Sequence, residues 1–118
     1  MLASATLVAE QRAAFVELGA ADLARGFIEL PRALQLLVTN TSPAGFALDV
    51  WPASPVFEAL QIEGVGAQVV LPAEGGAITL RGARLGAERL ELGVRLLLKR
   101  GLEPGRYPWP LMVTVRPL

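Results

Sequence analysis

Two stretches of this sequence alternate apolar and polar side chains with a period of two, the period of a half-buried β-strand. In the segment 88–101, ERLELGVRLLLKRG, apolar residues occupy every second position and charged residues lie between several of them. The apolar positions are Leu90, Leu92, Val94, Leu96 and Leu98. A helix is disfavoured because Gly93, in the middle, costs about 1 kcal/mol relative to alanine. The segment therefore predicts a strand with one face in a core.

The C-terminal segment, EPGRYPWPLMVTVRPL, has the same period. Its apolar face consists of Trp109, Leu111, Val113 and Val115. Pro108 and Pro110 have no amide hydrogen to donate, so we expect the strand to begin at an edge, a bulge or solvent. Pro104 and Gly105, just before it, predict a type II turn, in which the glycine takes a positive φ.

Shorter segments of strand character fill the middle of the chain, separated by turns rich in Gly, Pro, Ser and Asn. They are 33–40, 45–52, 56–64, 67–72 and 76–82. The glycine-rich stretches 64–66 and 74–77 predict hairpin turns, because neither is followed by the helix and Lys-Ser/Thr pair of a phosphate loop. Regular short strands of this kind predict an all-β antiparallel sandwich of one domain.

The N-terminal segment 5–27, ATLVAEQRAAFVELGAADLARGF, has a composition that suits a helix. Phe15, Val16 and Leu18 surround a single Glu17, as in a strand, and Gly19 is expected to end any helix early. We expect strand here, with helix as the alternative.

The first ten residues carry one face of mostly small apolar side chains, Ala3, Ala5, Leu7 and Ala9. Val8 interrupts the polar face opposite. Such a segment suits the edge groove of another copy, or it is the first strand of its own domain. The residues alone favour the second interpretation.

Composition excludes several classes of function. The 11 basic and 11 acidic side chains cancel, which disfavours a nucleic-acid partner. There is no cysteine and no histidine, so disulfides, thiol nucleophiles and the usual zinc ligands and general bases are missing. No apolar run approaches the roughly 20 residues that span a bilayer, and the start lacks the basic region of a signal peptide. We expect no catalytic residue, metal, cofactor or membrane insertion.

The remaining candidate residues have ordinary structural explanations. The nearest carboxylate pairs, Glu58 with Glu63 and Glu88 with Glu91, suit solvated strand faces better than a hydrolase site. Residues 40–42 match a glycosylation sequon, but Pro43 follows, and we expect a loop between strands. Trp109 shares a face with Leu111 and is expected in the core or a subunit interface; Trp51 is also open to stacking on a sugar.

The order of these features resembles the major subunits of chaperone–usher fimbriae, especially the alternate, colonization-factor-like pilins and the spore coat U-like proteins. The resemblance rests on ATLVAEQRAAFVEL as an extended leader, LQLLVTNTSPAGFALDV as a hairpin and LEPGRYPWPLMVTV as the last turn and strand. It implies an immunoglobulin-like sandwich, residues 13–118, that lacks its final strand. The leader, residues 1–12, of a neighbouring subunit would fill the resulting groove by β-strand addition.

Carried over to this sequence, the resemblance implies donor side chains at Ala3, Ala5, Leu7 and Ala9. It implies an acceptor groove lined by Phe15, Leu18, Leu111, Val113 and Val115. Head-to-tail addition does not close, so it would build a homopolymeric surface filament. The implied location is the bacterial cell surface, reached through the periplasm with a periplasmic chaperone and an outer-membrane usher.

Two functions follow as expectations. The first is a structural, non-enzymatic filament subunit. The second is a self-contained binding module that recognises a carbohydrate or a surface partner through Trp51 and the loops NTSPAG and PASP. An enzyme is third, since it needs carboxylate pairs that the sequence does not place together.

Overall fold

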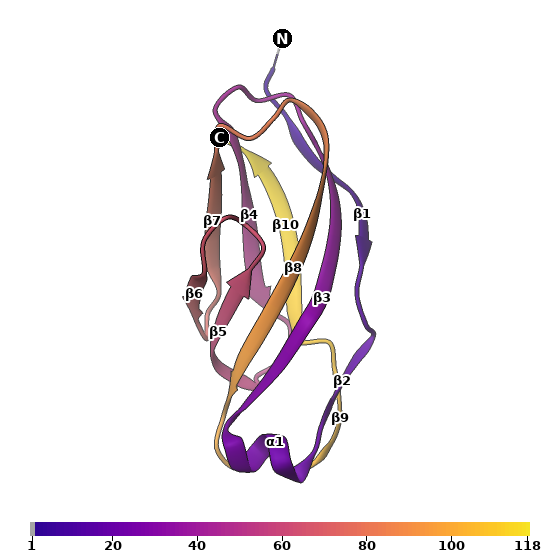
Figure 1. The fold of residues 1–118 in the computed structure, drawn as a ribbon, viewed down its shortest axis with the longest axis vertical. Coiled ribbons are helices and arrows are strands. Elements are labelled where there is room, and N and C mark those ends of the chain that lie inside the picture. The colour runs from indigo at the N-terminus through magenta and orange to yellow at the C-terminus, as the bar shows by residue number, and fades with distance from the viewer. Residues whose placement is uncertain (1) are drawn as a thin grey trace.

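A computed structural model describes residues 2–118 as an elongated all-β domain, about 51 × 22 × 20 Å, with one short helix at one end (Figure 1). The strands are β1 (Ala5–Gln11), β2 (Phe15–Leu18), β3 (Phe27–Asn40), β4 (Gly45–Pro52), β5 (Phe57–Glu63), β6 (Val69–Pro72), β7 (Gly76–Arg81), β8 (Gly86–Leu98), β9 (Gly105–Pro108) and β10 (Leu111–Pro117), and the helix is α1 (Ala20–Arg25).

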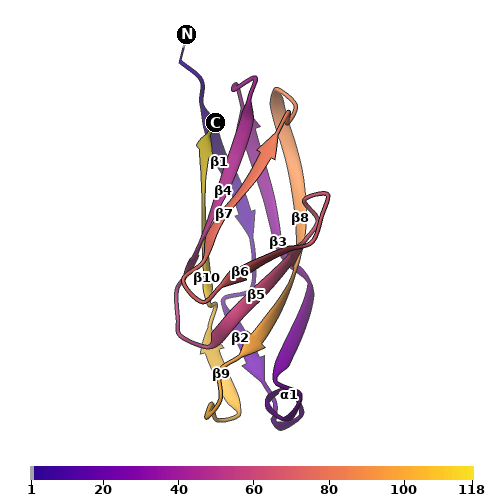
Figure 2. The same cartoon turned by 90° about the vertical axis from the view of Figure 1, so that its left-hand side faces the viewer.

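The strands form two facing layers, seen edge-on in Figure 2. One layer is a five-stranded sheet in the order β1-β3-β8-β5-β6, and the other is a three-stranded sheet in the order β10-β4-β7. A separate two-stranded ladder, β2-β9, extends the domain towards α1. Every strand pair is antiparallel, so the predicted antiparallel sandwich is confirmed.

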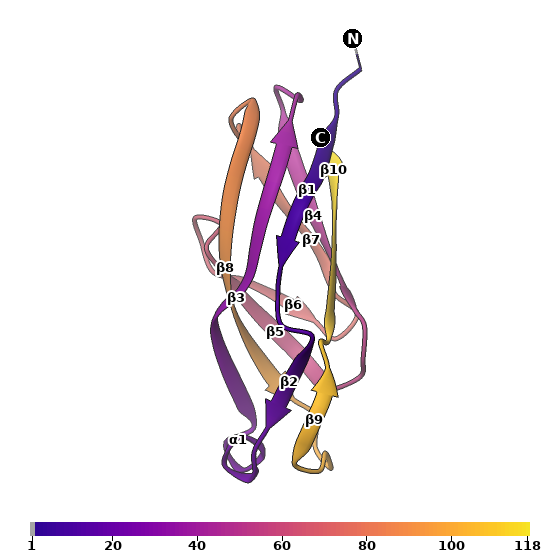
Figure 3. The same cartoon turned by 90° about the vertical axis from the view of Figure 1, so that its right-hand side faces the viewer.

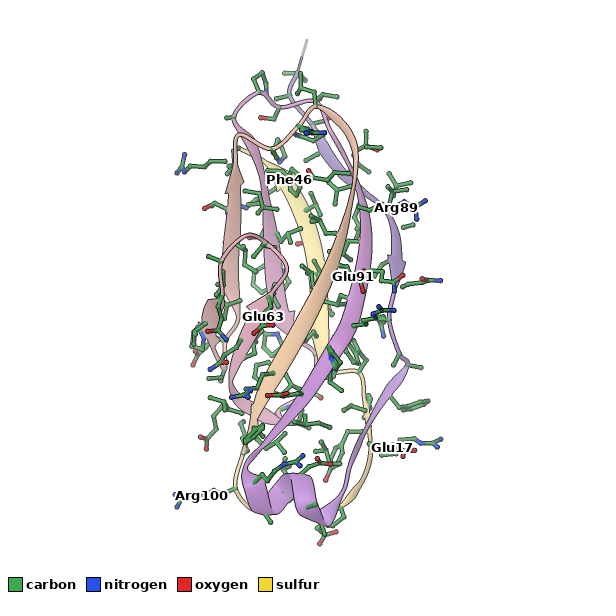
Figure 4. The ribbon with its side chains drawn as sticks, in the orientation of Figure 1. Glu17, Phe46, Glu63, Arg89, Glu91 and Arg100 are labelled. Carbon is green, nitrogen blue, oxygen red and sulfur yellow. The ribbon has the colours of Figure 1, made fainter. Side chains whose placement is uncertain are left out.

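The core lies between the inner faces of the two layers. All five alternating apolar residues of β8, from Leu90 to Leu98, are buried, as their spacing predicts. The facing sheet contributes Phe46, Leu48 and Val50 from β4. Figure 4 shows Phe46 between the layers while the side chains of Glu17 and Arg100 point outwards. Burial of one face of each strand holds the layers together.

The last strand has the predicted buried face, but the turn before it differs from the prediction. Gly105 has a φ of 158° and opens β9, where it pairs with Leu18, so its backbone is close to extended. The type II turn predicted at Pro104–Gly105 is therefore wrong. The glycine with a left-handed φ is Gly101, at 85°, four residues earlier. Gly105 is extended and not in a turn because its pairing with Leu18 of β2 requires an extended backbone.

The N-terminal segment contains two strands and also the helix. Our expectation that Gly19 would end any helix early is wrong, because Gly19 is the N-cap of α1. Its backbone N–H donates to Oδ2 of Asp22 at 2.9 Å, and Asp22 also pairs with Arg25 in the last turn. This local capping starts a helix directly after a strand that ends at Leu18.

The two glycine-rich turns have different roles. Residues 64–68 join β5 to β6 in one antiparallel hairpin, as predicted. The turn at 73–75 instead carries the chain from β6 in the five-stranded sheet to β7 in the three-stranded sheet, so the hairpin expected there is wrong. Gly75 has a φ of 83°, and a Cβ on it would lie 2.0 Å from the carbonyl oxygen of Val50. This sheet-switching turn tolerates no side chain.

Replacing Gly75 by alanine tests this packing, with Gly82→Ala as the matched control. Both glycines have a positive φ, but a Cβ on Gly82 meets nothing within 4 Å. We expect Gly82→Ala to lower the free energy of unfolding by about 1 kcal/mol and Gly75→Ala by about 3 kcal/mol or more. Urea unfolding measures both, and equal losses would contradict the close approach at Gly75.

Candidate functional site

Strand β1 forms one edge of the five-stranded sheet and pairs only with β3 of the same chain. Leu7 lies opposite Val38, a core residue, and Leu7 is itself only partly buried. The register then shifts, because Val8 has no partner and Ala9 pairs with Leu37. A bulge of this kind gives one strand an extra residue and changes which side chains face the core.

The bulge divides the four side chains predicted to act as the donor face. Ala5 and Leu7 are partly buried against the core. Ala9 lies opposite Leu37, whose neighbours on both sides are buried, so Ala9 and Leu37 face outwards. Ala3 precedes the strand and is exposed. The single small face expected from the sequence is therefore limited to Ala5 and Leu7 in this structure.

Strand β10 is also an edge strand, and only one of its edges is paired. Two flanking hydrogen bonds give the direction of its backbone: Ala53 N–H donates to the Pro110 carbonyl at 2.7 Å, and Leu118 N–H donates to the Gly45 carbonyl at 3.0 Å. Even-numbered residues therefore direct their backbone groups to β4, and Leu111, Val113 and Val115 direct theirs to the other edge. No strand of residues 2–118 forms a ladder there.

The unpaired edge of β10 lies beside β1. Figure 3 shows the two strands side by side and running in opposite directions, each belonging to a different sheet. Thr41 N–H donates to the Ser4 carbonyl at 2.8 Å, so the even-numbered residues before the bulge face β3. Ala5 and Leu7 accordingly direct backbone groups towards β10. We call this seam between the facing edges of β1 and β10 the open seam.

The open seam contains three of the five side chains predicted for the acceptor groove. Leu111 and Val113 are 1% and 7% exposed, and Val115 is partly buried against the same core. The same residues thus place side chains in the core and backbone groups on an edge without a ladder. Because backbone groups close to a core are nearly always hydrogen-bonded, we take the open seam as the candidate site.

Phe15 and Leu18 lie elsewhere. Both belong to β2, which pairs with β9 and closes the seam at its lower end. Leu18 is buried in the core, whereas Phe15 is half-exposed with Arg106 5.4 Å from its ring centre. The expectation that they line the groove beside β10 is not met. The β2-β9 ladder, which the sequence did not indicate, separates them from it.

The two tryptophans have different environments. Trp109 is buried and its backbone N–H donates to the Ala14 carbonyl at 3.0 Å, which places it in the core as predicted. Trp51 is 51% exposed, lies opposite the exposed Met112, and has its indole nitrogen 3.4 Å from Oγ1 of Thr114. Trp51 is therefore the one tryptophan available to a ligand or partner.

The loops expected to join Trp51 in a binding site are not brought together. NTSPAG precedes β4 and PASP follows it, so the length of the strand separates them. Only PASP is near Trp51, and residues 52–55 border a shallow cavity of about 390 Å³ with Phe57, Glu74 and Lys99.

One member of each carboxylate pair contacts a different side chain. Glu91 forms an ion pair with Arg32 at 3.1 Å, and Glu63 accepts a long hydrogen bond from Gln68 at 3.5 Å. Within residues 2–118, no cluster of three Asp, Glu, His or Cys side chains is arranged to hold a metal ion. The same residues contain no helix of the length and hydrophobicity needed to cross a bilayer.

Fluorescence tests the contrast between the tryptophans. In Trp51→Phe the remaining emission comes from buried Trp109, so we expect a blue-shifted spectrum that acrylamide quenches weakly. In Trp109→Phe the emission comes from Trp51 and should be red-shifted and quenched several-fold more strongly, consistent with its half-exposed side chain. Similar quenching of the two variants would contradict this assignment.

Comparisons with models of protein families, with curated proteins and with solved structures find no match to this chain.

Proposed function

We propose that this protein is the structural subunit of a bacterial surface filament, and that copies join by exchanging β1. The observation that carries the proposal is the second edge of β10, where the backbone groups of Leu111, Val113 and Val115 have no ladder although their side chains belong to the core or its margin. Backbone groups near a core are nearly always hydrogen-bonded, so such an edge favours the addition of a strand.

Strand β1 is suited to be the donor. It has one neighbouring strand, and its inward side chains, Ala5 and Leu7, are only partly buried. Its separation from β3 therefore costs less apolar burial than separation of any central strand. The short link at residues 12–14 then acts as the hinge between β1 and β2.

Exchange reproduces the same contacts in a different pair of chains. A β1 strand that leaves its own β3 and pairs with β3 of the next copy regains each residue pair, from Ala5 with Asn40 to Gln11 with Gln35. The net change in contact free energy is then small, and protein concentration determines the state. A donated strand is not linked to β2 of the chain that receives it, so it can approach β10 of that chain and form hydrogen bonds at both of its own edges.

The exchange is head-to-tail: each chain donates one segment and receives another at a different surface. Such a heterologous contact does not close on itself unless a ring forms, so it extends into a fibre. In the chaperone–usher fimbriae that the sequence resembles, a periplasmic chaperone and an outer-membrane usher serve this assembly. We propose the same class of partners here, because an unassembled subunit with a vacated edge needs protection from aggregation.

A binding module is the second candidate. The exposed Trp51, its apolar neighbour Met112 and the cavity at residues 52–55 support it. Under this alternative the chain remains a monomer and Trp51→Ala loses a carbohydrate ligand without loss of stability.

A pair of cysteines distinguishes exchange from intrachain pairing. Thr6 lies directly opposite Thr39 on the outer face of β1 and β3. The chain has no native cysteine, so two introduced cysteines are the only thiols. We expect the Thr6→Cys, Thr39→Cys protein to form filaments by negative-stain electron microscopy. After oxidation and denaturation without reductant, it should migrate as a ladder of covalent oligomers, because each disulfide joins two chains.

The matched control is Gln61→Cys with Val70→Cys, an opposed pair on β5 and β6 that stays within one chain. Its disulfide should leave only monomers on the same gel. Absence of filaments, or filaments in which the disulfide between positions 6 and 39 gives only monomers, would contradict β1 exchange.

A further inference from the structure

The residues Asn40, Thr41 and Ser42 form a hydrogen-bonded loop at the end of β3. Asn40 and Ser42 are the only fully buried polar residues within 2–118. The Asn40 amide nitrogen donates to the carbonyls of Ser42 and Arg84 at 3.1 and 3.3 Å, and its oxygen accepts the Ser42 N–H at 2.9 Å. The Ser42 hydroxyl donates to the Leu118 carbonyl at 2.9 Å. The loop is therefore anchored on both sides of Thr41.

Thr41 projects from this loop towards the start of the leader. Its Oγ1 accepts the Ser4 N–H at 2.9 Å, lies 2.9 Å from the Ser4 hydroxyl, and donates to the Ser4 carbonyl at 3.3 Å. With the Thr41 N–H bond to the same carbonyl, four hydrogen bonds join two residues. If the Ser4 hydroxyl is the donor in the contact between the two hydroxyls, the Thr41 hydroxyl accepts from the Ser4 N–H and the Ser4 hydroxyl and donates to the Ser4 carbonyl. All three of its hydrogen-bonding positions are then used by Ser4.

The leader needs such a contact because its side chains define its register weakly. A shift of β1 by two residues keeps the same faces inward, and it would place Ala5 opposite Val38 and Leu7 opposite Leu36. Because alanine side chains are small, the observed and the shifted register pack nearly equally well. A polar contact at one defined position does discriminate, because the shifted strand no longer presents the Ser4 hydroxyl to Thr41.

We propose that the Thr41 hydroxyl is the register-determining recognition site for Ser4 of the leader, with the buried Asn40 and Ser42 holding it in place. Before exchange the site binds the chain's own leader, as the structure shows. After exchange it binds the leader of a second copy of this chain, and this part rests on the proposed function. The site selects a segment that carries a hydroxyl one residue before its strand begins. The sequon-like triplet thus serves strand recognition, and the Asn40 amide is occupied in the fold.

Disulfide trapping tests this in dilute monomer. Thr6→Cys with Thr39→Cys reports the observed register, and Thr6→Cys with Leu37→Cys reports the two-residue shift. We expect Thr41→Val to lower the ratio of the first cross-link to the second by about tenfold, since it removes three side-chain hydrogen bonds. Ser4→Ala removes one and should lower the ratio by about two- to threefold.

Two variants separate recognition from general destabilisation. Thr41→Ser keeps the hydroxyl and should retain the original ratio, while Thr79→Val removes an exposed β7 hydroxyl that makes no contact with the leader and should also retain it. Ser4 lies outside every strand, so Ser4→Ala decides the outcome if Thr41→Val does not fold. An unchanged ratio in Ser4→Ala and in folded Thr41→Val would overturn the proposal.

These cross-links form within single chains, so they report the register whether or not filaments assemble. Loss of interchain cross-links alone would contradict the exchange and leave the recognition site standing. An unchanged register ratio in Ser4→Ala and in folded Thr41→Val would contradict the recognition site and leave the exchange standing.

Discussion

The fold depends on one constraint: β10 has two edges, and only the edge beside β4 is paired in a ladder. Its side chains are needed in the core, so the strand cannot move out to water, and prolines at 110 and 117 lie just before the strand and at its last position. The backbone between these prolines is left with a row of donors and acceptors directed at the open seam. A sandwich with this edge has a defined place for another strand.

The leader and the loop at residues 40–42 complement this constraint. Under the proposed exchange β1 leaves its own sheet, which is compatible with the partial burial of Ala5 and Leu7. Weak burial also weakens the register, which the hydroxyl contact between Ser4 and Thr41 restores at one point. In the proposed exchange, weak apolar burial lets β1 leave its sheet, and the contact between Ser4 and Thr41 defines its register.

The sequence predicted those elements whose side chains alone determine their burial. The alternation in β8 and β10 was sufficient because each has one face in the core, and that alternation survives in any antiparallel sandwich. Elements that depend on contacts distant in sequence were missed. The bulge at Val8 arises from pairing with β3, and the extended backbone of Gly105 follows from pairing with β2. Helix α1 was missed although Asp22, three residues after Gly19, was a capping signal in the sequence.

The most direct test of the open seam is amide hydrogen exchange, resolved by residue, in the monomer and in assembled protein. In the monomer we expect the amides of Leu111, Val113 and Val115 to exchange at least about tenfold faster than those of Met112, Thr114 and Arg116, which face β4. In the filament the first three should become as slow as the others. Equal protection of both sets in the monomer, or fast exchange of the first set in the filament, would contradict the account.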